Sequence, residues 1–111
     1  MSNEKDKNML KVFISQPMAG LSEKEIKKRR KDIERSLREI LKQEFSVIQS
    51  VYDDDFSKEK NPSVKYLAKS INDLADADVA FFAHGWEEAR GCCIEHEVAL
   101  KYFIRIIHER L

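Results

Sequence analysis

Apolar residues along this chain follow two alternating periods, and the alternation predicts strands and helices in turn. Residues 10–15 and 79–83 are nearly continuously apolar, which is typical of strands that are buried on both faces of a sheet. Residues 45–51 predict a further strand, and residues 104–107 predict a short last one.

Helical spacing separates these strands. Ser22 followed by Glu25 predicts a capping box that opens a helix reaching about Gln43. Asn61 and Pro62 predict the start of a second helix. A third helix is predicted from Gly91 to about residue 103. The apolar positions expected to face the core of the first two helices are Ile26, Ile33, Leu37, Ile40 and Leu41, then Val64, Leu67, Ala68, Ile71, Leu74 and Ala75.

Strands that alternate with helices favour a parallel sheet covered on both faces and joined by right-handed crossovers. We therefore expect a single-domain, three-layer α/β/α fold over residues 9–111, with four to five strands. The polar residues 1–8 are expected to be a disordered tail. In such sheets ligands bind beyond the carboxyl ends of the strands, where the loops 15–21, 52–55 and 84–90 are expected to converge.

Composition narrows the functional classes. The 111 residues carry 20 Lys and Arg against 20 Asp and Glu, so the formal net charge is zero, which argues against a nucleic-acid or membrane-surface role. The longest apolar run, 79–83, is too short to span a bilayer, and residues 1–8 do not resemble a secretory signal. The two cysteines are adjacent, so no disulfide scaffold is expected and the cytoplasm is the expected compartment.

A basic run at residues 27–31 raises the question of nucleic-acid binding again. Acidic residues at positions 23, 25, 32, 34 and 39 interleave with it. We therefore interpret this surface as a solvated helix face crossed by i,i+4 ion pairs.

One charged residue conflicts with the pattern around it. On a helical wheel Glu95 falls near the middle of an arc expected to face inward, formed by Gly91, Ile94, Val98, Ala99 and Tyr102. Burying an unpaired carboxylate is costly, so Glu95 needs a partner or a function. Geometry leaves two interpretations open: pairing with Arg90 or backbone amides, or chemistry in a ligand crevice.

Four other groups are weaker candidates, each with a structural alternative. Cys92 and His96 share a helix face and, with His84, have metal-ligating side chains, but neither Cys-x-x-Cys nor His-Glu-x-x-His occurs, so no metal is expected. A cysteine at the helix start is a possible nucleophile with a histidine base. Asp53 could bind Mg²⁺ or ribose hydroxyls, or it could simply belong to a solvated loop. Trp86 could stack on a nucleobase, or it could simply cover the core.

Two motifs connect this chain to a known superfamily. The segment Val12-Phe13-Ile14-Ser15-Gln16-Pro17-Met18-Ala19-Gly20 comes first; Ala77-Asp78-Val79 and the run from Gly85 to His96 follow it. Together they resemble the nucleoside 2-deoxyribosyltransferase-like superfamily, in particular its small bacterial and phage branch of uncharacterised domains. The resemblance implies a Rossmann-like or flavodoxin-like sheet and chemistry at an N-glycosidic bond.

The resemblance also implies roles for individual residues. Glu95 stands where the family places its nucleophile, with Ala99 at the family's spacing and Glu97 in place of a glycine. The family's Asp that assists the base corresponds to Ser70, and Asp73 lies one helical turn later as a partial substitute. Arg90 and the amides at the start of its helix would bind an anion. The expected substrate-binding residues are Ser15, Gln16, Pro17, Met18, Gly20, Asp53, Gly85, Trp86, Arg90, Gly91 and Cys92.

The first functional hypothesis is therefore an enzyme that cleaves or exchanges the N-glycosidic bond of a nucleoside or nucleotide through Glu95. The alternative is a non-catalytic module that senses a nucleotide-like ligand, and the absence of the family's Asp at Ser70 favours it. Neither hypothesis needs a metal or an organic cofactor. By analogy with relatives, a homodimer or higher homo-oligomer is expected.

Overall fold

Four parallel strands form the centre of the molecule in the computed structural model, which describes residues 9–48 and 55–110. Their order in the sheet is β2-β1-β3-β4, which matches the beginning of the flavodoxin-like order. The expected parallel α/β sheet is confirmed, with four strands in the described residues. The strands are β1 (Leu10–Ser15), β2 (Phe45–Val47), β3 (Val79–Phe82) and β4 (Arg105–His108).

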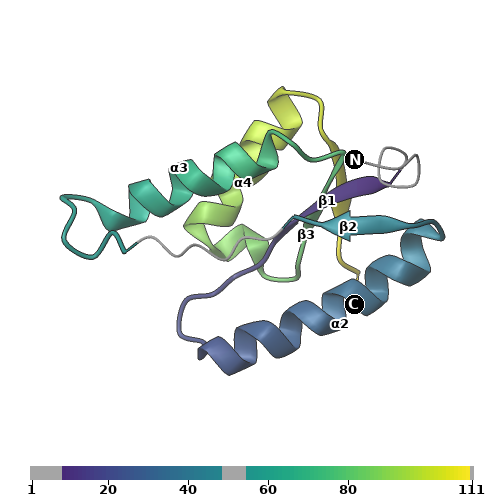
Figure 1. The fold of residues 1–111 in the computed structure, drawn as a ribbon, viewed down its shortest axis with the longest axis horizontal. Helices are drawn as coiled ribbons and strands as arrows, with labels where there is room; N and C mark the ends of the chain where they lie inside the picture. The colour runs from purple at the N-terminus through teal and green to yellow at the C-terminus, as the bar shows by residue number, and fades with distance from the viewer. Residues whose placement is uncertain (1–8, 49–54, 111) are drawn as a thin grey trace, which may run out of the picture.

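Helices cover both faces of this sheet, which makes three layers (Figure 1). The helix α2 (Glu23–Leu41) covers one face, while α3 (Pro62–Leu74) and α4 (Arg90–Lys101) cover the other. The core is divided accordingly. The cluster on the α2 face is formed by Val12, Ile14, Ile33, Leu37, Val79, Phe81 and Ala83. The cluster on the α3 and α4 face is formed by Phe13, Leu74, Ala80, Phe82 and Ala99.

Local signals in the sequence set the helix starts. The Ser22 side chain accepts a hydrogen bond from the Glu25 amide, and the Glu25 carboxylate accepts one from the Ser22 amide, so the predicted capping box is present. Asn61 caps α3 through its side chain, and Pro62 is the first helical residue. The N-cap of α4 is Ala89, which offers no side-chain acceptor.

The motif residue Asp78 has a structural function. Its carboxylate accepts a hydrogen bond of 2.8 Å from the Lys11 amide, and its own amide donates one of 2.8 Å to the Lys11 carbonyl. These two bonds align the start of β3 with β1, so the register that follows brings Ser15 level with Phe82. The carboxyl ends of both strands therefore open at the same edge of the sheet.

Several predicted boundaries differ from the structure. The second strand ends at Val47, and residues 49–51 of its predicted span lie outside the described residues. The third helix begins one residue earlier than predicted and ends at Lys101. The last strand is shifted to Arg105–His108. A short 3₁₀ helix, η1 (Trp86–Glu88), lies within the predicted loop 84–90.

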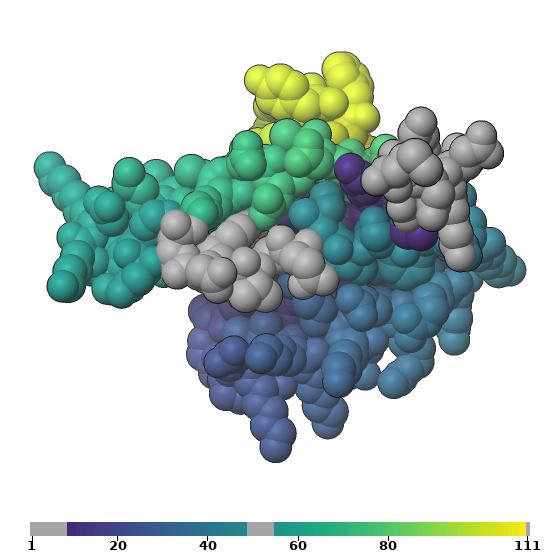
Figure 2. All heavy atoms as spheres, in the orientation of Figure 1, coloured from purple at the N-terminus to yellow at the C-terminus, as the bar shows by residue number. Residues whose placement is uncertain are grey.

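The inward face expected for α4 is partly wrong. Ile94 is 40% exposed and Tyr102 is 76% exposed, whereas the buried residues of the helix are Cys92, Glu95 and Ala99. The buried stripe of α4 therefore runs along Cys92, Glu95 and Ala99, and Val98 packs partly buried against the same core cluster. The end of α4 and the turn after it project from the surface (Figure 2), where Phe103 is 95% exposed.

Candidate functional site

The carboxylate of Glu95 lies in the second turn of α4, only 7% exposed, and both of its oxygens are hydrogen-bonded. The Ser15 hydroxyl donates to Oε1 over 2.7 Å, and the Ser70 hydroxyl donates to Oε2. Three separate elements, β1, α3 and α4, thus meet at this single carboxylate. The sequence-based expectation that Glu95 faces inward is confirmed, and hydroxyl groups supply its hydrogen bonds.

Strand alternation and helix periodicity bring the two serines to this point. Ser15 is the last residue of β1 and shares a sheet face with Phe13, which faces the α3 and α4 layer. Its backbone is fixed, because the Ser15 carbonyl accepts a 2.9 Å hydrogen bond from Ala83. Ser70 lies one turn before the buried Leu74 on α3, so it is on the side of that helix turned toward the sheet.

Burial raises the pKa of the Glu95 carboxyl above its ordinary value, while the hydrogen bonds from Ser70 and Ser15 act in the opposite direction. Desolvation penalises the charged form, and the two donated hydrogen bonds stabilise it. The hydroxyls are therefore the groups that keep an ionised Glu95 accessible at neutral pH.

Cys92 adjoins the same carboxylate. It is 5% exposed, and burial raises the pKa of its thiol, with Ser15 lowering it and the Glu95 charge raising it further. A thiol in these surroundings stays protonated, which is unfavourable for a cysteine nucleophile. Both cysteines are free thiols, as expected from their adjacent positions.

Two of the three loops expected to converge, 15–21 and 84–90, contact each other, while residues 52–54 of the third loop lie outside the described residues. Gly85 has a φ of +91°, and a Cβ added there would lie 3.5 Å from Cγ of Pro17. Gly20 also has a positive φ, +80°, within the turn that the Met18 carbonyl closes with the amide of Leu21. The convergence predicted for the loops 15–21 and 84–90 is therefore present.

Gln16 points toward α2, away from Glu95. Its side-chain amide donates a 3.4 Å hydrogen bond to the Ile26 carbonyl, and in the described part of the chain its buried Oε1 has no partner. Together with Pro17 and Arg29, it lines a hollow of about 400 Å³ on the α2 face of the sheet. The last residue of β1, Ser15, thus points to one side of the sheet, and the residue after it, Gln16, points to the other.

The first turn of α4 lies directly before Glu95. Ala89 supplies no capping side chain, and the first residues, Arg90 and Gly91, are exposed. Uncapped amides at a helix start and a neighbouring guanidinium form the kind of position that binds an anion.

Trp86 belongs to a separate cluster of aromatic rings. Its indole stacks on the imidazole of His96 with centroids 4.0 Å apart, and it also stacks on His108 at the end of β4. His96 in turn lies edge-on to Phe82 of β3. Since β3 separates β1 from β4 in the sheet, this cluster lies on the β4 side of α4, whereas Glu95 faces β1 and α3. The described contacts do not bring Trp86 to Glu95.

The remaining candidates fall elsewhere. The α3 side chain that bonds to Glu95 is Ser70. Asp73, the predicted partial substitute, lies about one turn further along the same helix. Asp53 lies outside the described residues. Across residues 9–48 and 55–110, no three or more His, Cys, Asp or Glu side chains form a group that could hold a metal ion.

Sequence analysis missed two residues at the carboxyl edge. Glu109 pairs with Arg29 of α2 and accepts a 2.8 Å hydrogen bond from the His84 amide, which ties three segments together. His108 contacts the ring of His96. No local signal marks either residue, because both act through partners on other elements of the fold.

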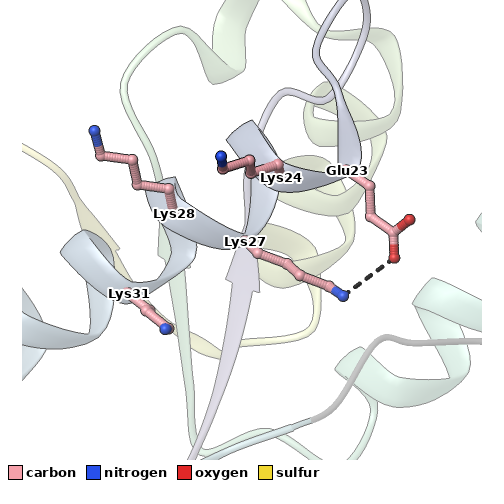
Figure 3. Close-up of a pocket in the computed structure, with 5 residues that line it drawn as sticks. All are labelled: Glu23, Lys24, Lys27, Lys28 and Lys31. Atoms are coloured by element: carbon pink, nitrogen blue, oxygen red, sulfur yellow. Dashed lines mark ion pairs between the residues drawn. The ribbon is translucent and has the colours of Figure 1, made fainter.

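The basic run of α2 borders a surface hollow of about 540 Å³ (Figure 3). Its lining residues are Glu23, Lys24, Lys27, Lys28 and Lys31. The Lys27 ammonium and the Glu23 carboxylate are 3.2 Å apart, and both side chains are largely exposed. This helix covers the sheet face opposite to α3 and α4, so the hollow is separate from Glu95. An exposed i,i+4 pair of this kind agrees with a solvated face.

Comparison with known proteins gives one match. A family model described as a domain of unknown function (DUF4406) matches residues 10–108. The chain matches no curated protein and no solved structure. In the described part of the chain, none of the helices combines the length and the apolar composition needed to cross a membrane.

Proposed function

The chain belongs to the family described as a domain of unknown function (DUF4406), and for this member we propose cleavage or exchange of the N-glycosidic bond of a nucleoside or nucleotide. The observation that carries the proposal is the buried Glu95 carboxylate, held by Ser15 and Ser70 at the carboxyl edge of a parallel sheet. Ligands of such sheets bind at this edge. A buried carboxylate with a shifted pKa is a frequent mark of a reactive group.

In the proposed reaction an oxygen of Glu95 attacks the anomeric carbon of the sugar. The bond from that carbon to the base nitrogen breaks, its electron pair leaves with the base, and the base takes a proton. The product is a glycosyl ester of Glu95. Attack by water then releases the sugar and regenerates the carboxylate, whereas attack by a second base completes an exchange.

Ser15 and Ser70 would orient the nucleophile in this reaction. Each carboxylate oxygen that accepts one hydroxyl hydrogen bond retains a further lone pair for bond formation. The hydrogen bonds favour the ionised form against the effect of burial, which the first step requires. Arg90 and the uncapped amides at the start of α4 would bind a 5′-phosphate, in the case of a nucleotide.

The second candidate is a non-catalytic sensor of a nucleotide-like ligand. The raised pKa of Glu95 favours it, because a larger protonated fraction makes the carboxyl a poorer nucleophile and a better hydrogen-bond donor. At the position of the family's assisting carboxylate stands Ser70, a hydroxyl that cannot transfer a proton at neutral pH as readily.

One screen separates the two candidates. The protein is incubated with a panel of nucleosides and 5′-monophosphates, and the free base is measured by chromatography. Release that is lost in Glu95→Gln, but kept in the exposed control Glu97→Gln, supports the enzyme. Ligand-dependent thermal shifts with no base release support the sensor. Release that Glu95→Gln leaves unchanged overturns the role of Glu95.

Two wider parts of the proposal concern partners and compartment. The exposed apolar residues Tyr102 and Phe103 provide surface for the expected homo-oligomer, which sedimentation tests directly. Free Cys92 and Cys93 suit a reducing compartment such as the cytoplasm.

A further inference from the structure

Two histidines from consecutive elements, His96 of α4 and His108 of β4, face each other at the carboxyl edge of the sheet. The Nε2 atoms of His96 and His108 are 2.8 Å apart. Their ring centroids are 5.1 Å apart, and their planes differ by only 20°. The centroid distance exceeds the nitrogen distance by about one ring diameter, so the rings lie edge to edge with their nitrogens directed at each other. Only one of these nitrogens can carry a proton in this arrangement.

Other rings fix this pair in place. The indole of Trp86 lies flat against His96 at 4.0 Å and 11°, and nearly parallel to His108 at 5.5 Å and 12°. The edge of Phe82 packs against His96 at 4.7 Å. Both imidazoles therefore pack against the same indole ring, and this packing largely fixes their orientation before any ligand binds.

The charges around the pair suit a cation. The carboxylates of Glu87 and Glu97 interact electrostatically with the His96 ring and place negative charge beside it. Glu97 is itself paired with Lys101 over 3.4 Å.

We propose that His96 and His108 bind a divalent transition-metal ion through their Nε2 atoms, in place of the proton that they share. Imidazole nitrogens bind such ions at about 2.0–2.1 Å, so two ligands at right-angled to tetrahedral geometry lie roughly 2.9–3.3 Å apart. The observed 2.8 Å needs only a small change in the distance between the nitrogens. Because the two Nε2 atoms now point at each other, each ring must also pivot in its own plane by roughly 35–45° for its lone pair to meet the ion. Such a movement keeps both rings stacked on Trp86.

Two imidazole nitrogens as ligands favour one class of metal ion over another. Two imidazoles suit Cu²⁺, Ni²⁺ and Zn²⁺, with Cu²⁺ bound most tightly, rather than Mg²⁺ or Ca²⁺. Among the described residues no third metal-binding side chain completes the group, so the other coordination positions belong to water or to an external ligand. This site does not depend on the proposed glycosidic activity, because Glu95 lies on the other side of α4.

Trp86 is the single tryptophan of the chain, so its fluorescence reports on this site without a label. The full-length protein is titrated with CuCl₂ in a non-coordinating buffer. We expect saturable quenching with one ion per chain. Excess Zn²⁺, which is diamagnetic, should displace Cu²⁺ and restore the emission.

Variants decide the assignment. His96→Asn and His108→Asn each remove a direct ligand, so each should weaken Cu²⁺ binding at least as much as the roughly 10–100-fold that losing an outer-shell partner costs. The chain has three histidines, and His84 is the one outside the proposed site. His84→Asn is therefore the matched control, and it should leave Cu²⁺ binding unchanged. His108 is exposed, so His108→Asn stays informative even where His96→Asn lowers stability. Equal Cu²⁺ affinity in folded His108→Asn, or no saturable quenching of the unmodified protein up to millimolar Cu²⁺, overturns the proposal.

Discussion

Consecutive residues of α4, Glu95 and His96, point in directions about 100° apart around the helix and belong to two different polar clusters. Glu95 turns toward β1 and α3 and is held by two hydroxyls. His96 turns toward β3 and β4 and lies among aromatic rings. Burial raises the pKa of the first and lowers the pKa of the second.

Both shifts have one cause, because desolvation disfavours whichever form is charged. An acid therefore holds its proton longer, and a base loses it earlier. The difference lies in the partners: the hydroxyls at Glu95 restore part of the charged form, whereas the second imidazole at His96 disfavours it. The hydrogen bonds around Glu95 favour its ionised form, whereas the surroundings of His96 favour its neutral form.

The largest expected effect comes from removing the charge on the Glu95 side. Glu95→Gln keeps the shape of the side chain but removes the nucleophile, so base release should fall on the order of 10³–10⁶-fold. Trp86 fluorescence should stay as in the unmodified protein, because its ring cluster is separate. The measurement is chromatography of the released base together with an emission spectrum. A folded variant with full base release contradicts the mechanism.

Removing one hydroxyl should have a smaller effect on the same side. Ser70→Ala and Ser15→Ala each remove a hydrogen bond to the carboxylate, worth about 1.5–3 kcal/mol for a charged acceptor, so base release at neutral pH should fall roughly 10–100-fold. Loss of a donor raises the pKa of Glu95 further, and the acidic limb of the pH–rate profile should therefore move to higher pH. The matched control is Ser63→Ala, at an exposed serine in the first turn of α3. An unchanged profile in both variants would remove the serines from the mechanism.

The sequence was sufficient for most of the fold because its signals are local. The capping box at Ser22, the Asn61 and Pro62 start of α3 and the apolar run of β3 each specify their own element. Glu95 stood out for a similar reason, as a charge among apolar residues at helical spacing. These features need no knowledge of what packs against them.

The contacts that define the two clusters are not local. Ser15 and Glu95 are 80 residues apart, and His96 and His108 are on different elements. Hydrophobicity alone placed Ile94 and Tyr102 inward, whereas the structure buries the small residues Cys92 and Ala99 of this helix. The residue pattern therefore singled out Glu95 as a candidate, and only the packing shows that Ser15 and Ser70 donate hydrogen bonds to its carboxylate.

A moderate effect on stability should depend on pH. Because the folded-state pKa of Glu95 is raised, its protonated form contributes stability below the unfolded pKa of about 4.3, and that contribution is lost as pH rises through the folded pKa. Glu95→Gln does not titrate, so it should match the unmodified protein at low pH and exceed it at neutral pH. The gain should be about 1 kcal/mol, or about 4–8 °C in melting temperature. Thermal melts across the pH range test this. A variant that melts several degrees lower at neutral pH identifies Glu95 as a structural ion partner instead.

The smallest expected effect comes from an exposed glutamate of the same helix, two residues after Glu95, and it tests whether negative charge alone or a buried carboxylate is needed. Glu97 is exposed, and its ion pair with Lys101 is 3.4 Å long with side chains 59% and 68% exposed. Pairs of this kind contribute about 0.3–0.5 kcal/mol, and salt screens them. Glu97→Gln should therefore lower stability by no more than about 0.5 kcal/mol, by an amount that shrinks in high salt, and it should leave base release unchanged. The measurement is denaturant unfolding at low and high salt beside the same chromatographic assay. If Glu97→Gln altered base release as much as Glu95→Gln, the negative charge of α4 as a whole, rather than the buried carboxylate, would carry the activity.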